Sequence, residues 1–123
     1  MTDRKDRLIK LLAVVEAGTL WRGNVQSVTD LKLNKHLVFQ ANHGSLDAAR
    51  ALHEAVLQGW AWTKGFSIVD AGSTFITVFL EHEDDNKWEV FFGANDNSAR
   101  AWLIAILKAL IAGEDTNAND KGE

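Results

Sequence analysis

Three strand-like runs between residues 59 and 93 place large apolar side chains at both alternating positions, and this pattern limits the folds open to the chain. In the middle run, Phe75 and Phe79 share one parity, whereas Ile76, Val78 and Leu80 share the other. A sheet with one face in water would alternate apolar with polar residues instead. The predicted sheet therefore needs cover on both faces, or it leaves an exposed aromatic face that forms an interface. The outer runs mix the parities similarly, with Trp60, Trp62, Phe66 and Ile68 opposite Val69, and Trp88, Val90 and Phe92 opposite Phe91.

Three further segments have the apolar spacing of amphipathic helices. The first covers residues 3–17, and its stripe consists of Leu8, Leu11, Leu12 and Val15. The second covers residues 45–58, with the Ser45 hydroxyl as its N-cap and His53 at the border of its apolar stripe. The third runs from about residue 99 to residue 112 and is capped by Asn97 or Ser98. Its wide apolar face predicts that it is heavily buried.

The order of these elements predicts an α+β fold in a single domain over residues 1–113, because 123 residues are too few for two separate cores. Short connections between the strands indicate an antiparallel sheet of three to four strands packed with helices. The segment 19–44 is irregular or forms a hairpin around Asn34 and Lys35. If the N-terminal helix covers the second sheet face, the result is a three-layer α/β/α sandwich. Residues 114–123 form a polar, acidic tail that we expect to fray.

Composition excludes several classes of protein. The chain has no cysteine, which rules out disulfides, zinc-thiolate sites and cysteine nucleophiles. Its N-terminal stretch lacks the pattern of a signal peptide, and no apolar window is long enough to span a membrane. We therefore expect a cytoplasmic protein that has no membrane partner.

Nucleic acid is a disfavoured partner. The order helix, three strands, helix over residues 45–112 is also that of double-stranded RNA-binding domains, which place lysines at the start of the last helix. Here that position reads Asn95, Asp96, Asn97 and Ser98, so a negative charge stands where a phosphate would bind. The net charge of −4 opposes phosphate binding as well.

The sequence contains few candidates for chemistry. The run Glu81 to Asp85, which includes His82, is the densest group of metal-capable side chains, but it lacks the spacing of a calcium loop and also fits a solvated hairpin turn. No phosphate loop, nucleophile elbow or zinc-protease motif is present. We therefore predict no catalytic residues, no metal and no cofactor. The binding candidates are Trp21 and Arg22, a residue pair typical of binding hot spots, and the acidic residues Glu83, Asp84 and Asp85. The sequence fits equally well a Trp21 that folds back on the sheet together with Leu20.

Two stretches resemble a family of small bacteriophage and prophage proteins, the phage ABA sandwich domain family. The first is SLDAARALHEAVLQGWAWTKG, and the second is SARAWLIAILKALIAG; the opening LIKLLAVVEAG is similar to the first helix of that family. The resemblance covers residues 8–18, 44–69 and 96–113. It implies a three-layer fold and a phage context, and it implies no reaction, cofactor or catalytic residue.

Three hypotheses about function follow. The first is a non-enzymatic phage accessory protein that binds a host bacterial protein, as an anti-defence inhibitor (anti-CRISPR-like) that occludes a surface. The second is a structural or self-assembling phage component, a homodimer formed through a sheet face. The third is a metal-dependent enzyme that uses the turn around His82.

Overall fold

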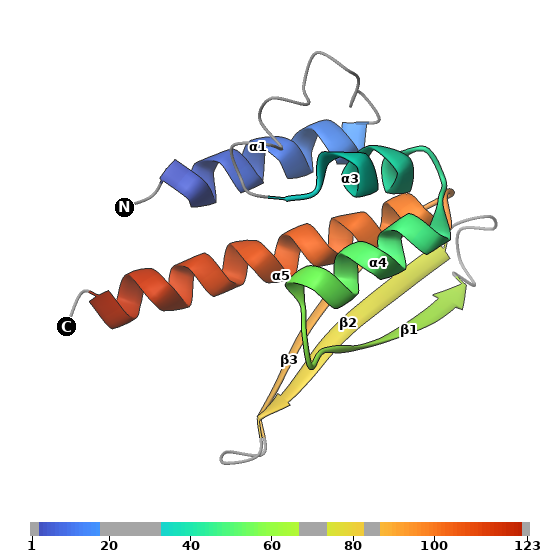
Figure 1. The fold of residues 1–123 in the computed structure, drawn as a ribbon. Helices are drawn as coiled ribbons and strands as arrows, with labels where there is room; N and C mark the ends of the chain where they lie inside the picture. The colour runs from blue at the N-terminus through green and yellow to red at the C-terminus, as the bar shows by residue number, and fades with distance from the viewer. Residues whose placement is uncertain (1–2, 18–32, 67–73, 83–86, 122–123) are drawn as a thin grey trace.

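The computed structural model describes residues 3–17, 33–66, 74–82 and 87–121 (Figure 1). Its elements confirm the α+β class and the antiparallel sheet, for which the sequence predicted three to four strands and the described residues form three. Helices and strands follow the expected order, with one additional short helix before the second predicted one. The elements are α1 (Asp3–Ala17), α3 (Lys35–Asn42), α4 (Leu46–Val56), β1 (Ala61–Phe66), β2 (Thr74–His82), β3 (Lys87–Asn95) and α5 (Ser98–Lys121).

The sheet has the order β1-β2-β3, with both neighbouring pairs antiparallel. On β2, Ile76 and Val78 are fully buried and face the helices. Their cross-strand partners on β3 are Gly93 and Phe91, respectively, and Val78 also pairs with Trp62 of β1. Because side chains alternate between the faces of a strand, the other parity of each strand points away from the helices.

Helix α5 lies directly on the inner face of the sheet and is the centre of the core. Every residue from 101 to 107 is buried, which confirms the burial predicted from its apolar face. The helix backbone approaches β3 most closely at Gly93. A Cβ atom added at Gly93 would lie 2.0 Å from the carbonyl oxygen of Ala101 and 2.9 Å from the amide nitrogen of Ala105. Only glycine at this position leaves room for the helix.

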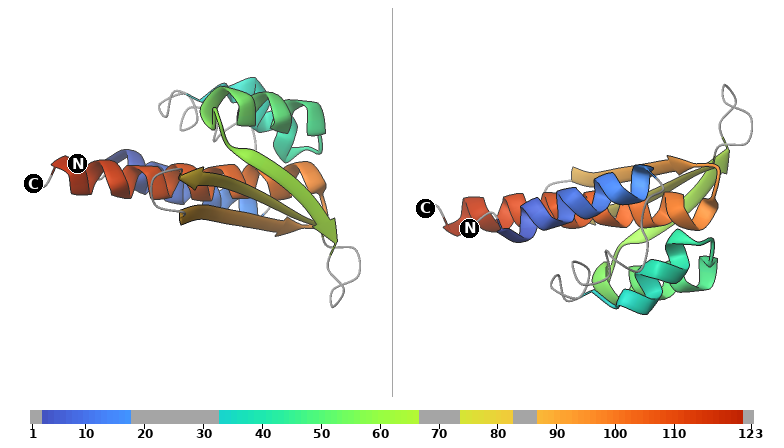
Figure 2. Two further views of the ribbon diagram at one scale, coloured as in Figure 1. Left: turned by 90° about the horizontal axis from the view of Figure 1, so that it is seen from below. Right: turned by 90° about the horizontal axis from the view of Figure 1, so that it is seen from above.

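Helix α1 packs on α5 and not on the second face of the sheet (Figures 1 and 2). Its buried residues Leu8, Leu11 and Val15 pack in the same core as the apolar residues of α5, and Arg4 forms an ion pair with Glu114 near the far end of α5. The described layers are therefore sheet, α5 and α1, with α3 and α4 beside α5. The expected order of helix, sheet and helix is wrong for these residues, because α5 is apolar on both its sheet side and its α1 side.

The hairpin expected around Asn34 and Lys35 is also wrong, because these residues begin helix α3. The Asn34 side chain is the N-cap, and its Oδ1 accepts hydrogen bonds from the backbone amides of His36 and Leu37 at 3.0 and 3.2 Å. Val38 and Ala41 lie three residues apart and are both buried, which is helical spacing. In a hairpin, this spacing would place them on opposite faces of the strand.

The capping predictions are confirmed at two helix starts. Ser45 Oγ accepts a hydrogen bond from the Ala48 amide at 3.1 Å. Asn97 Oδ1 accepts hydrogen bonds from the amides of Ala99 and Arg100 at 3.0 and 3.2 Å.

At its other end, α5 continues through Gly113 to Lys121. The prediction of a frayed tail after Gly113 is therefore wrong for the residues up to Lys121. The contact of Glu114 with Arg4 joins this extension to α1 just beyond the expected helix end.

The close approach at Gly93 gives a stability prediction. We expect Gly93→Ala to lower the free energy of unfolding by about 3 kcal/mol, because the new methyl group overlaps the backbone of α5. Gly65→Ala on β1 is the matched control, since a Cβ there meets nothing within 4 Å. Urea unfolding followed by circular dichroism measures both variants. Equal stability of the two variants would contradict the close contact of α5 with β3.

Candidate functional site

The binding residues proposed from the sequence lie outside the described part of the chain. Trp21 and Arg22 fall in the segment 18–32, and Glu83, Asp84 and Asp85 fall in the segment 83–86. His82 ends strand β2. Among the described residues, no group of three or more histidine and acidic side chains could hold a metal ion. No helix in the described ranges is long and apolar enough to cross a membrane.

The outer face of the sheet is apolar and open. The strand pattern allowed either cover on both faces or an exposed aromatic face, and the described residues show the exposed face. Phe75 and Phe79 of β2 and Val90 and Phe92 of β3 share this parity, and Val90 pairs directly with Phe79. Val90 and Phe92 are 51% and 53% exposed, which is high for side chains of this kind. The rings of Phe75 and Phe92 meet edge to face with their centroids 6.2 Å apart. No described helix packs on this face (Figure 2).

The open face carries no charge among its described side chains. The outward positions between these residues are held by small or neutral residues: Ala61, Thr63, Gly65, Thr77 and Ala94. Beyond Phe79 and Val90, the register places Glu81 of β2 and Trp88 of β3 at the same parity, so the uncharged part of the face ends at Phe79 and Val90. At the β3 edge, the Lys108 ammonium donates a hydrogen bond to the Phe92 carbonyl oxygen at 3.0 Å and lies 5.3 Å from the centre of the Phe92 ring. The alkyl chain of Lys108 also lines a shallow apolar groove between α1, α5 and β3 with a volume of about 410 Å³.

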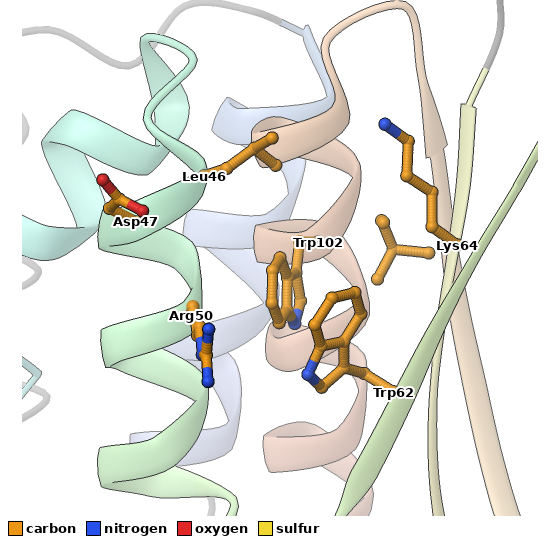
Figure 3. Close-up of a pocket in the computed structure, with 7 residues that line it drawn as sticks. Leu46, Asp47, Arg50, Trp62, Lys64 and Trp102 are labelled. Atoms are coloured by element: carbon orange, nitrogen blue, oxygen red, sulfur yellow. The ribbon is translucent and has the colours of Figure 1, made fainter.

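A separate cleft opens between α4 and β1, on the side of the sheet that faces the helices (Figure 3). One wall consists of Leu46, Asp47 and Arg50 from the first turns of α4. The opposite wall consists of Trp62 and Lys64 from β1. Trp102 of α5 and Ile76 of β2 form the floor. The volume of the cleft is about 190 Å³.

The floor of this cleft is held by a buried histidine that connects three elements. Trp102 Nε1 donates a hydrogen bond to His53 Nδ1 at 3.2 Å. Because indole nitrogen is only a donor, Nδ1 is the acceptor, and the Nε2–H of His53 donates to the Trp60 carbonyl oxygen at 3.0 Å. His53 thus joins α4 to α5 and to the residue that precedes β1.

The sequence placed His53 at the border of its helix stripe, and this interpretation is wrong. The side chain is 3% exposed, because the imidazole satisfies both ring nitrogens inside the core. A polar residue adjacent to an apolar stripe looks like a surface residue unless its partners, here 7 and 49 residues away in the chain, are known.

Sequence reasoning also missed the cleft. In the sequence, the cleft is indicated only by two features. Asp47 and Arg50 lie three residues apart on the helix, and Trp60 and Trp62 follow the end of that helix. The pairing of Trp62 with Trp102, whose ring centroids are 4.1 Å apart, depends on tertiary structure.

Comparisons of the chain with protein-family models, with curated proteins and with solved structures give no significant match. The resemblance to the phage ABA sandwich domain family therefore stays a prediction.

The hydrogen bond between Trp102 and His53 predicts that substitutions at Trp102 and Trp62 differ in their effect on stability. We expect Trp102→Phe to lower the free energy of unfolding by about 2 kcal/mol, because it leaves His53 Nδ1 buried without a donor. Trp62→Phe, at a residue that is 42% exposed, should lower it by less than about 1 kcal/mol. Chemical denaturation of the two variants checks the difference, and a smaller effect for Trp102→Phe than for Trp62→Phe would argue against a structural role of this hydrogen bond.

Proposed function

We propose that the chain is a non-enzymatic phage or prophage accessory protein that binds a bacterial host protein through the open face of its sheet. Binding of this kind inhibits the host protein by covering one of its surfaces, as an anti-defence protein would. The observation that carries the proposal is the exposed apolar face formed by Phe75, Phe79, Val90 and Phe92. The phage context comes from the resemblance found in the sequence.

The size of this face indicates how a partner would engage it. The uncharged outward positions run from Phe75 to Phe79 on β2 and from Val90 to Ala94 on β3, so this part of the face is about 17 Å long and, with three strands, about 14 Å wide. This area of roughly 240 Å² is about a third of the surface that one partner buries in a stable interface. A partner must therefore extend past the β3 edge, where Lys108 connects the open face with the apolar groove that contains Ile9 and Leu12.

The chemistry of the face defines the partner. From Phe75 to Phe79 and from Val90 to Ala94 the face has no charged side chain, which favours an apolar, uncharged surface on another protein, because a charged group placed against it would lose water without gaining a partner. Nucleic acid is the wrong partner for such a face. At the start of α5, Asp96 is exposed, and the Arg100 guanidinium already donates two hydrogen bonds to the Asn42 carbonyl oxygen at 2.9 and 3.1 Å.

A second candidate function is self-assembly through the same face. A two-fold dimer places the same patch on both sides of the interface. The chain has a net charge of −4, yet the outward side chains from Phe75 to Phe79 and from Val90 to Ala94 are uncharged, so two copies can meet over these positions without repulsion between like charges.

The test of the proposed function is a pull-down with tagged protein from nuclease-treated bacterial lysate. We expect a stoichiometric host protein to be retained by the natural chain and lost with Phe92→Asp, which places a charge among the apolar side chains of the open face. Leu46→Asp is the matched control, because Leu46 is exposed on the first turn of α4, away from the sheet face, and a negative charge at a helix start is tolerated. We expect it to retain the partner.

Sedimentation of the purified chain at low micromolar concentration separates the two candidates. A monomer that captures a host protein supports the inhibitor. A dimer that Phe92→Asp converts into a monomer, with no host protein captured, supports self-assembly. A monomer with no captured protein, or capture that is insensitive to Phe92→Asp, would contradict the role of the open face.

A further inference from the structure

Strand β1 is an edge strand of the sheet, and it is exposed along its length. Within the described ranges its only strand partner is β2, so its other side faces no described strand. Every residue from 61 to 65 is exposed, although successive side chains point to opposite faces of the sheet. On β2, by contrast, Ile76 and Val78 are fully buried. Because the N–H and C=O groups of successive residues point to opposite sides of a strand, about half of those on β1 lie at this open edge.

Helix α4 lies on the β1 side of the molecule, away from β3 (Figure 2). It packs on α3 and α5, whereas β1 packs on β2, and α4 and β1 do not pack extensively on each other. The cleft between them has an apolar floor, on which Trp62 lies against Trp102, and Leu46 stands on the α4 wall (Figure 3). Trp62 and Leu46 are 42% and 44% exposed. A strand placed beside β1, at a spacing of about 4.8 Å, would therefore have this cleft under its inward side chains.

The charges around the cleft are balanced. Asp47 and Arg50 line it from α4, and Lys64 lines it from β1. Arg50 is paired with Glu54 at 3.2 Å, and Figure 3 shows the Lys64 ammonium directed away from Arg50. Two cations and two carboxylates leave no net charge to attract an ion, and a charged group entering the cleft would lose water without a partner. The cleft therefore favours an uncharged occupant.

The opposite edge of the sheet is less suited to the addition of a strand. There the Lys108 ammonium donates a hydrogen bond to the Phe92 carbonyl oxygen at 3.0 Å, so one acceptor of β3 is already occupied. An added strand is favoured at β1, where the cleft also receives its side chains.

The volume of the cleft limits what an added strand can place in it. Pockets for drug-sized molecules are about 300–1,000 Å³, whereas this cleft is about 190 Å³. It accommodates one branched apolar side chain. We infer that an extended segment of another protein adds to the sheet beside β1 and places an uncharged apolar side chain in the cleft, against Trp62 and Leu46. Backbone hydrogen bonds then provide the affinity, and the cleft selects the side chain.

The test is a titration of the isotope-labelled full chain with a synthetic peptide, followed by nuclear magnetic resonance. The probe is a peptide of the length of β1 with capped ends, in which leucine alternates with threonine. Beside β1, its leucines face the cleft and its threonines face the opposite side of the sheet. We expect saturable shifts at the β1 amides and at the Trp62 indole N–H, and slower hydrogen exchange at alternate β1 amides. The same peptide with aspartate in place of leucine should not bind.

Methylation of the peptide nitrogens separates strand addition from nonspecific contact with the cleft. One modified peptide is methylated at its leucine nitrogens, and another at its threonine nitrogens. Because successive N–H groups of a strand point to opposite sides, only one of these two sets faces β1. We expect one methylated peptide to bind at least about ten-fold more weakly, through the loss of backbone hydrogen bonds, and the other to bind much like the parent peptide.

Two variants of the chain locate the site. Leu46→Asp places a charge on the α4 wall and should weaken binding of the leucine peptide by about five-fold or more, because the charge would lose water against the bound side chain. Ile9→Asp is the matched control, because Ile9 is 43% exposed on α1, where it lines the groove between α1, α5 and β3. It should bind the peptide like the natural chain. Since both residues are exposed, the fold tolerates either substitution.

Several results would overturn the inference. These are no saturable shift with the leucine peptide, equal binding or equal loss with the two methylated peptides, unchanged hydrogen exchange on β1, and equal effects of Leu46→Asp and Ile9→Asp. A dimer of the chain alone that the peptide dissociates would also overturn it, because a second copy would then occupy the edge. The pull-down with Phe92→Asp concerns the outer face of the sheet, so failure of one proposal leaves the other intact.

Discussion

The fold depends on the contact between helix α5 and the inner face of the sheet. This helix is the only described element that packs against helices α1, α3 and α4 and against strands β2 and β3. Its approach to β3 is set by the missing side chain at Gly93, where the Ala101 carbonyl occupies the position of a Cβ atom. The amide nitrogen of Ala105 and the Cβ of Ile104 also lie 2.9 Å from this position, so helix and strand meet at backbone distance. Ile76 and Val78 complete the contact from β2.

Local patterns in the sequence predicted the elements better than their arrangement. Ser45 and Asn97 could be recognised as caps because a capping side chain acts within three residues of its own position. Strand parity also separated Phe75 from Ile76 correctly. The stripe on residues 3–17 predicted a helix, yet it could not show whether α5 or the sheet receives it, because both surfaces are apolar. Asn34 was assigned to a turn because asparagine favours turns and helix caps alike.

The two candidate surfaces were predictable to different degrees. The apolar outer face follows from strand parity, which is a property of each strand alone. Whether this face is covered or open depends on where α1 packs, and the sequence did not show that. The cleft brings together residues as distant as Asp47 and Trp102, and its floor depends on a hydrogen bond between His53 and an indole 49 residues away. No spacing rule within one helix or strand contains this information. The same bond ties the floor of the cleft to the core.

The hydrogen bond from Lys108 to the Phe92 carbonyl oxygen affects how other chains can approach. Strand β3 is an edge strand, and the unpaired backbone groups of an edge can template the addition of a foreign strand, as happens in amyloid growth. Here Lys108 of α5, the helix that covers the inner face, donates a hydrogen bond to β3 and so occupies the Phe92 carbonyl oxygen, one of the acceptors on this strand. A β-strand seeking to extend the sheet at this edge would have to displace an ammonium group first. Lys108 therefore opposes the addition of a strand at this point of the β3 edge, while the outer face of the sheet stays open to a folded neighbour.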